Sequence, residues 1–339
     1  MKTESQLIEN ISGRLPRSPL QVNQLFESDA EILKSGEGYL LYSVDDYSKE
    51  DHFRTTNPFI LGRNLAIATI SDIYASGGVP EYYLHSVVLN SEEWSNSFMT
   101  EFSAGVGKVL KEAGAFFLGG DLGLSNNWHY TATVTGRSHR VLTRKGTKPG
   151  ETILITGTAG AGNTEAAISI FNLENHFPSI ELNLRKMESE LISRFATTCI
   201  DTSDGVVNSL NIISELNKTG YEITSCRYHP LSKCVVENLG VPDELLLLGE
   251  CGEYELLFTI DTNNLADFFT EAEEMQLQFT SIGNVTTPDE KILLTSNGLI
   301  NLLDFNIRGR DFAMEEDYIA SLIQYLKSHG INKYSGIKK

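Results

Sequence analysis

The chain contains six aspartates on separate turns marked by glycine or serine, and together they could hold a hard metal ion. They are Asp29, Asp45, Asp72, Asp121, Asp201 and Asp204. Mg²⁺ prefers oxygen ligands and commonly bridges protein carboxylates and nucleotide phosphates. Unit charges about 4 Å apart repel by roughly 4 kcal/mol at an effective dielectric of 20, so a converged set of carboxylates needs a cation. Our working hypothesis is therefore a Mg²⁺- and ATP-binding centre.

Each acid also has an ordinary explanation. The segment 201–205 (DTSDG) precedes an amphipathic run, where Ser and Asp commonly cap a helix, so capping is the default interpretation and metal ligation the alternative. Asp72 interrupts an otherwise apolar helix, where a lone buried carboxylate is costly. Asp45 and Asp121 follow apolar strands, and ligands gather at strand ends in α/β sheets. Taken singly, each is by default a surface acid.

A glycine-rich turn at 157–162 (GTAGAG) lies between an expected strand and an expected helix, and its N–H groups could hold a phosphate. Its spacing matches neither the dinucleotide fingerprint nor the P-loop, which requires a lysine. An ordinary strand-to-helix turn is the favoured interpretation.

The length of 339 residues, with 41% hydrophobic and 21% charged residues, predicts a folded chain of two domains. A net charge of −18 disfavours nucleic-acid and anionic-membrane partners. The four cysteines form no Cys-x-x-Cys pair, which is typical of reduced thiols. The sequence has no run of about 18 apolar residues and opens with polar and acidic residues, so we expect a cytoplasmic protein without a membrane span or signal peptide.

Apolar periodicity predicts alternating strands and helices along the whole chain. Strands are expected at 38–44, 81–90, 116–118, 129–136, 152–156, 255–260 and 279–282, and helices at 59–76, 94–113, 165–171, 187–197 and 206–216. A basic, turn-rich segment at 137–150 marks the boundary between the two halves. We predict an α/β (α+β) fold with domains at 1–148 and 149–330 and a disordered tail at 331–339. The absence of an internal repeat excludes solenoids and propellers.

Several short motifs follow one another in an order that resembles a known superfamily. They are Ser28-Asp29-Ala30, Ser43-Val44-Asp45 with His52-Phe53, Ile70-Ser71-Asp72, Gly119-Gly120-Asp121, Leu142-Thr143-Arg144, Lys148-Pro149-Gly150, Asp201-Thr202-Ser203-Asp204-Gly205, and Glu253-Tyr254-Glu255-Leu256 with Ile282-Gly283. Over roughly residues 28–312 the chain resembles the superfamily of thiamine-monophosphate kinase, aminoimidazole ribonucleotide (AIR) synthetase, selenophosphate synthetase and the hydrogenase maturation dehydratase. Among these members it is most similar to the kinase.

The resemblance implies an ATP-dependent transfer of a phosphoryl group to a small phosphate monoester such as thiamine monophosphate. It implies Mg²⁺ ligands at Asp29, Ser43, Asp45, Asp72, Asp121, Asp201 and Asp204. It implies nucleotide contacts from Gly120, Asp121, Arg144 and Ser203, catalytic roles for Asp204 and Arg144, and substrate contacts from His52 and Glu253. It also implies a homodimer in which the N-terminal mixed sheets close a barrel.

The chain departs from the kinase pattern at several motifs. Ser28 stands for an acid, Val44 for a threonine, and Leu122-Gly123 for two threonines, and the segment 251–254 lacks a glycine pair and one acid. Phe305 is a candidate for the kinase's C-terminal aromatic residue, although a core phenylalanine explains it equally well. Two alternative functions stay open, an ATP-dependent synthetase or ligase that activates a carbonyl oxygen and a non-catalytic nucleotide-binding regulator.

Overall fold

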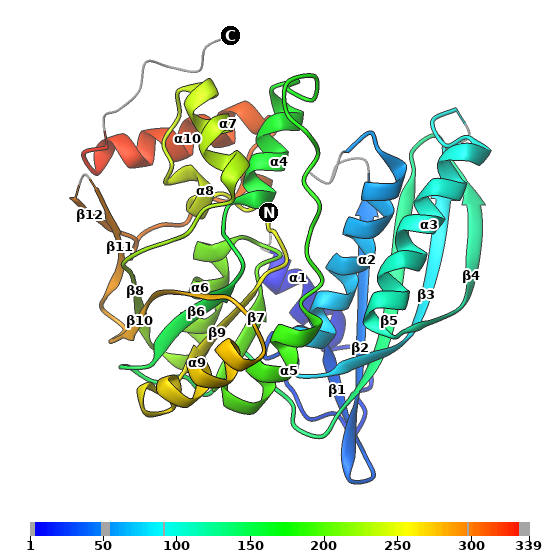
Figure 1. Ribbon diagram of the computed structural model, residues 1–339, viewed down its shortest axis with the longest axis horizontal. Helices are drawn as coiled ribbons and strands as arrows, with labels where there is room; N and C mark the ends of the chain where they lie inside the picture. The colour runs from blue at the N-terminus through cyan, green and yellow to red at the C-terminus, as the bar shows by residue number, and fades with distance from the viewer. Residues whose placement is uncertain (1–3, 49–54, 91, 297, 332–339) are drawn as a thin grey trace.

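The computed structural model describes residues 4–48, 55–90, 92–296 and 298–331. The N-terminal part forms a five-stranded sheet in the order β1-β2-β5-β3-β4, in which β3 and β4 are parallel and the other pairs antiparallel. Helices α2 and α3 pack on one face of this sheet (Figure 1). The elements are α1 (Glu4–Ser12), β1 (Glu31–Ser35), β2 (Gly38–Ser48), α2 (Pro58–Ala75), β3 (Val79–Leu89), α3 (Asn96–Ala113), β4 (Phe116–Leu124) and β5 (His129–Ser138).

The C-terminal part forms a seven-stranded sheet in the order β12-β11-β8-β10-β6-β9-β7. Its strands are β6 (Thr152–Thr156), β7 (Thr198–Asp201), β8 (Gly220–Ile223), β9 (Leu256–Ile260), β10 (Phe279–Thr286), β11 (Lys291–Thr295) and β12 (Gly298–Asn301). Its helices are α4 (Ala161–Ile170), α5 (Lys186–Phe195), α6 (Val206–Asn217), α7 (Pro230–Leu239), α8 (Leu245–Leu248), α9 (Leu265–Glu274) and α10 (Glu315–Ser328). Within the described ranges, no helix has the length and apolarity needed to cross a membrane.

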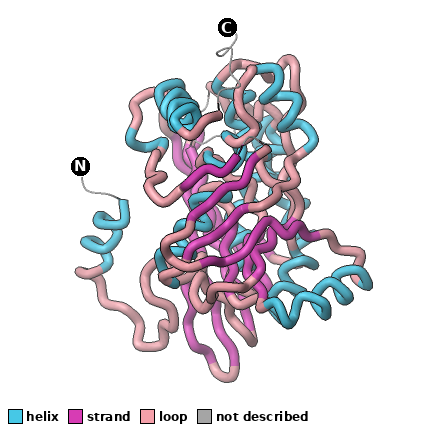
Figure 2. Tube along the Cα trace, turned by 90° about the vertical axis from the view of Figure 1, so that its left-hand side faces the viewer, coloured by secondary structure: helices cyan, strands magenta, loops and turns pink. Residues whose placement is uncertain are grey.

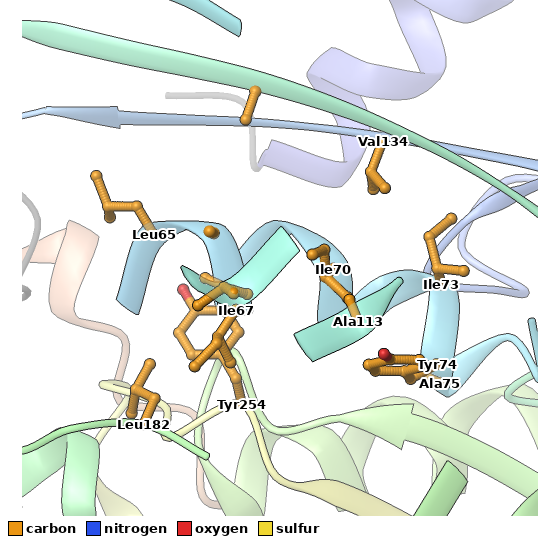
Figure 3. Packing of buried hydrophobic residues seen from close by; sticks show 14 of the residues in the cluster. Leu65, Ile67, Ile70, Ile73, Tyr74, Ala75, Ala113, Val134, Leu182 and Tyr254 are labelled. Atoms are coloured by element: carbon orange, nitrogen blue, oxygen red, sulfur yellow. The ribbon is translucent and has the colours of Figure 1, made fainter. Parts of the chain in front are cut away.

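Helix α2 is the central element of the molecule because it is buried on all sides. It begins after Asn57, whose side chain accepts hydrogen bonds from two backbone N–H groups of the first turn. One side of α2 packs on the five-stranded sheet at Val134, and the other side packs on Leu182 and Tyr254 of the C-terminal part (Figure 3). A single hydrophobic cluster therefore crosses from one sheet to the other.

The open face and the free edge of the five-stranded sheet carry exposed apolar side chains. In β4, which pairs only with β3 among the described strands, these are Phe116, Phe117, Leu118, Leu122 and Leu124. Helix α1 lies apart from the body of the chain, and its apolar side chains are also exposed (Figure 2).

The structure confirms the mixed α/β class and every helix and strand that periodicity predicted. Several boundaries were wrong, for example the strand expected at 279–282 continues to Thr286 and the helix expected at 165–171 begins at Ala161, and two of the errors concern the site. β2 continues to Ser48 and β4 to Leu124, so Asp45 and Asp121 lie within strands and not at their ends. No closed barrel forms within the described part of a single chain.

Two expectations concern the C-terminal part of the chain, the aromatic residue Phe305 and a disordered tail at 331–339. Phe305 packs in the core of the C-terminal part with an exposed fraction of 7%. Ile331 is buried, and the rest of the expected tail, 332–339, lies outside the described residues.

Candidate metal and nucleotide site

Three aspartates from distant parts of the sequence converge between the two sheets. Asp29 precedes β1, Asp72 lies in the last turn of α2, and Asp201 ends β7. One carboxylate oxygen of each lies within 4.8 Å of the others. All three side chains are largely shielded from solvent, with exposed fractions of 2% for the Asp29 side chain and 1% for Asp201.

Neighbouring serines hold these acids in place. Ser76, which ends α2, contacts the Ser28 hydroxyl at 3.0 Å and accepts a hydrogen bond from the Ala30 N–H at 3.0 Å, so it fixes the backbone on both sides of Asp29. Ser43 on β2 donates a hydrogen bond to Asp72, and Ser71 on α2 donates one to Asp201. The serines thus link α2 to both sheets at the point where the carboxylates meet.

Burial and, after it, mutual repulsion raise the pKa values of the acids. Burial, followed by the charge of Asp201, raises the pKa of Asp45 to about 7. Burial and then the charge of Asp45 raise the pKa of Asp72 well above its usual range, and burial and then Asp29 raise the pKa of Asp201 to about 6. Without a cation, these groups retain protons that an exposed aspartate loses.

The donor set fits a hard divalent cation. Asp29 Oδ2 is buried and has no hydrogen-bond partner among the described residues. Leaving a buried charged oxygen without a partner costs more than about 1–3 kcal/mol, so a ligand at this position would remove a penalty. The group of potential ligands found among the described residues consists of three carboxylates, and oxygen ligands are the preference of Mg²⁺ and Ca²⁺ rather than of softer metals.

Arg144 lies in the same site but is held by Asp29. Its Nη2 is 2.8 Å from Asp29 Oδ1, its Nη1 donates to the Phe26 carbonyl at 3.3 Å, and its Nε is buried without a hydrogen-bond partner in the described part of the chain. The arginine therefore neutralises one of the three acids in the absence of metal.

The segment 201–205 does not cap a helix. α6 begins after Gly205, which has a φ of +78°, and no side chain makes a capping hydrogen bond there. Instead, the N–H and hydroxyl of Ser203 both donate to Asp201 Oδ1. Asp204 is half-buried and stands outside the set of three. The default capping interpretation was wrong, and the geometry favours the alternative in which this loop presents acids to a ligand.

Two predicted nucleotide residues lie away from the three acids. Gly120 and Asp121 are on the edge strand β4, where Asp121 is exposed and is not part of the converged set. Gly120 packs against β3 so closely that a Cβ atom would lie 2.0 Å from the His85 carbonyl oxygen. Close strand packing alone thus explains this glycine.

The two predicted substrate residues also lie apart from the set. Glu253 is buried at the start of α4 and accepts hydrogen bonds from the N–H groups of Gly160 and Gly162 at 3.0 and 3.4 Å. Burial and then the charge of Glu255 raise its pKa to about 8. The glycine-rich turn is an ordinary strand-to-helix turn, and a carboxyl of the chain itself already occupies its N–H groups. His52 lies outside the described residues.

Sequence reasoning missed three residues that support the site. Ser71 and Ser76 orient Asp201 and Asp29, and Tyr47 hydrogen-bonds Asp45 and lies 3.4 Å from the Thr69 hydroxyl. Ser71 stood next to a predicted ligand and could have been included. Ser76 and Tyr47 carried no signal, because only the tertiary fold brings them to the acids.

Sequence comparison relates the chain to one family model and to a group of curated kinases. Residues 27–138 match the family of AIR synthase related proteins, N-terminal domain. Thiamine-monophosphate kinase of Aquifex aeolicus is 28% identical over 234 residues, covering 65% of this chain and 75% of the relative. The enzyme of the same name from Escherichia coli O157:H7 is 25% identical over 320 residues, covering 89% and 96%. The chain is thus similar to thiamine-monophosphate kinases over most of its length, and the family model matches its N-terminal part.

Several solved structures have the same fold as the chain. Thiamine monophosphate kinase from Aquifex aeolicus superimposes with a TM-score of 0.70 at 20% identity, covering 88% of this chain and 99% of that one. AaThiL complexed with AMPPCP and TMP gives 0.73 at 20% identity, covering 86% and 95%. The hydrogenase maturation protein HypE in complex with ATP gives 0.63 at 15% identity, covering 89% and 94%.

The raised pKa values of the buried aspartates predict how the stability of the chain depends on pH. The folded chain binds more protons than the unfolded chain between the usual aspartate pKa of 3.8 and about 7, so stability should fall as pH rises through this window. In EDTA, we expect the melting temperature to drop by about 4–8 °C between pH 5 and pH 8, from a loss of roughly 2 kcal/mol. Thermal unfolding followed by fluorescence checks this. Saturating Mg²⁺ should restore most of the loss at pH 8, and an unchanged melting temperature on adding Mg²⁺ would contradict the cation site.

Proposed function

We propose that the chain is an ATP-dependent phosphotransferase that transfers a phosphoryl group from Mg-ATP to a small phosphate monoester such as thiamine monophosphate. The main observation in support is that Asp29, Asp72 and Asp201 converge, and that Asp29 Oδ2 is buried without a hydrogen-bond partner among the described residues. The likeness to thiamine-monophosphate kinases along most of the chain supports this proposal.

Under this proposal the three converged aspartates hold Mg²⁺, with the Ser43 hydroxyl and Asp45 next to them. When bound, Mg²⁺ supplies charge neutralisation for the phosphate oxygens of the nucleotide. The acceptor is a phosphate monoester whose oxygen is already nucleophilic near pH 7, so the chain needs to position it rather than deprotonate it.

Arg144, Ser203 and Asp204 complete the proposed site. The guanidinium of Arg144 presents a planar set of donors that suits a phosphate once Asp29 has another partner. The Ser203 hydroxyl and the half-exposed Asp204 lie on the loop after β7, next to Asp201. We propose that this loop faces the transferred phosphoryl group.

The test is acceptor-stimulated release of ADP. With thiamine monophosphate and Mg-ATP we expect turnover on the order of 1 s⁻¹ or faster, as is usual for kinases. Binding of Mg-ATP without acceptor-stimulated ADP release would overturn the transferase. In that case, amide products from a screen of carbonyl substrates would indicate a synthetase, and their absence a nucleotide-binding regulator.

We also propose that the chain forms a homodimer through the five-stranded sheet, whose strands then close a barrel with those of the partner. The apolar side chains on β4 support a second copy as the occupant, because edge strands with exposed apolar residues pair readily with another chain. Asp121 lies on the same strand. In this arrangement Asp121 serves the site of the partner subunit, which accounts for its separation from the three acids of its own chain.

The organisation and location of the chain complete the proposal. The two sheets are formed by separate stretches, 31–138 and 152–301, which supports domains at 1–148 and 149–330. All four cysteines have free thiols, which supports a cytoplasmic protein.

A further inference from the structure

A pocket of about 230 Å³ lies beside the segment that leads into α2 and beside α4, away from the three aspartates. The residues that line it include Thr55, Glu165, Ser169, Glu174, Phe177 and Ser179. We call it the Glu165 pocket. It brings together residues of both parts of the chain, since Thr55 precedes α2 and the others belong to α4 or to the segment after it.

Glu165 is a buried acid without a partner. Its exposed fraction is 5%, and its Oε1 has no hydrogen-bond partner in the described structure. Burial alone raises the pKa of its carboxyl to about 8. An apolar residue on this face of α4 would avoid the cost of burying the carboxyl, so the fold gains nothing from the acid itself.

Two of the hydroxyls in the pocket wall are already paired with each other. Thr55 and Ser179 hydrogen-bond to each other at 2.6 Å, and Thr55 also accepts from the Asn57 N–H at 3.1 Å. No lysine, arginine or histidine lines the pocket within the described ranges. A ligand that brings an N–H donor would therefore give Glu165 Oε1 the partner that the described walls do not, and the half-buried ring of Phe177 offers that ligand an apolar surface.

A short series of contacts connects this pocket to the acidic loop after β7. Gly162 lies one turn before Glu165 on α4 and packs against the backbone of Gly252, so that a Cβ there would lie 2.0 Å from the Gly252 carbonyl oxygen. Gly252 in turn packs against the carbonyls of Thr202 and Ser203, next to Asp204. The pocket and the loop are thus separated only by the first turn of α4 and the chain at Gly252.

We propose that the Glu165 pocket binds the nitrogen-bearing end of the acceptor, an ammonium or an amino-substituted heterocycle, with Glu165 receiving its N–H and Phe177 covering its ring. The phosphate end of the same molecule then extends toward the loop 201–205. The placement of the phosphate end rests on the proposed phosphotransferase activity. The binding of the nitrogen-bearing end does not require any turnover.

Thiamine, which carries the amino-heterocycle and no phosphate, is the direct probe. Calorimetric titration of the full chain should show binding that Glu165→Met weakens at least about tenfold, because a hydrogen bond to a carboxyl is lost. Above pH 8, where the Glu165 carboxylate only accepts hydrogen bonds, oxythiamine, which has a carbonyl in place of the amino group, should bind the unmodified chain at least about tenfold less tightly. The exposed acid on α5 provides the control, and Glu190→Met should bind thiamine as the unmodified chain does.

The variant is expected to fold, because it removes a buried acid without a partner, and its melting temperature at pH 8 should not fall. Equal thiamine affinity in Glu165→Met and the unmodified chain, or no thiamine binding to the unmodified chain, overturns the proposal. Kinetics with thiamine monophosphate separate the two proposals. Thiamine binding that depends on Glu165, without phosphoryl transfer, would support the proposed role of the pocket and overturn the proposed kinase. Phosphoryl transfer by Glu165→Met with an unchanged KM for thiamine monophosphate would support the kinase and overturn the proposed role of the pocket.

Discussion

Asp72→Asn is expected to lower kcat/KM for phosphoryl transfer about a hundredfold to a thousandfold and, in the absence of metal, to make the protein more stable. The loss follows from removing one of three carboxylates proposed to hold Mg²⁺, a contribution comparable to other electrostatic groups of active sites. The gain follows because burial, and then the charge of Asp45, raise the pKa of Asp72 well above the usual range. Steady-state kinetics and thermal unfolding in EDTA measure the two effects.

The stability gain should depend on pH in a defined direction. At pH 8 the unmodified chain must carry or neutralise several buried charges, so Asp72→Asn should raise its melting temperature by about 4 °C or more. At pH 5 the difference should shrink, because the neighbouring Asp45 and Asp201, with pKa values of about 7 and about 6, are then protonated in the folded chain and no longer repel a charge at position 72. Asp46→Asn is the matched control, because Asp46 is exposed on β2 and pairs with Thr131 and His129 outside the site. Loss of activity together with loss of stability would show that Asp72 is merely structural.

Mixing two inactive variants, Asp121→Asn and Asp72→Asn, is expected to restore activity. If Asp121 serves the site of the partner subunit, a mixed dimer has one complete site, with Asp72 from one chain and Asp121 from the other. Random mixing makes about half of the dimers mixed, so about a quarter of the unmodified activity should return in a two-fold symmetric dimer. The effect is large because each variant alone should have almost no activity.

The experiment requires exchange of subunits, either by co-expression with two different affinity tags or by dilution and reconcentration. Purified dimers that carry both tags should reach about half of the unmodified activity, since one of two sites is intact. A mixture of Asp45→Asn and Asp72→Asn, both on the same side of the site, should stay inactive and is the control. Inactive mixed dimers of Asp121→Asn and Asp72→Asn would place Asp121 in the site of its own chain or outside it.

The sequence predicted the class of fold and the aspartates of the site better than their surroundings. Long amphipathic runs such as that of α3 have enough periodicity to be recognised, whereas four-residue strands such as β7 do not. Among the strands that were not predicted, β7 is the most important for the site, because it places Asp201 beside Asp29 and Asp72. Its place in the sheet depends on pairing with β9, more than 50 residues later in the sequence.

The partners of the site residues depend on contacts that no local pattern contains. Glu253 could be identified as unusual, but its hydrogen bonds to the turn at Gly160 connect residues 93 positions apart. The pairing of Arg144 with Asp29 spans 115 positions. In both cases the charge was visible in the sequence, and the group that satisfies it was not. Glu165 gave no signal at all, because an acid on a helix is usually exposed.

The burial of α2 between the two sheets limits how the molecule can move. Separating the sheets would expose apolar side chains such as Ile67 and Ile70, each worth about 1.5–3 kcal/mol when transferred to water. A hinge between the halves is therefore expensive, and the carboxylates at the end of α2 keep their spacing whether or not substrates are present. Entry and exit of ligands then depend on short surface segments, whose movements are faster than those of whole domains.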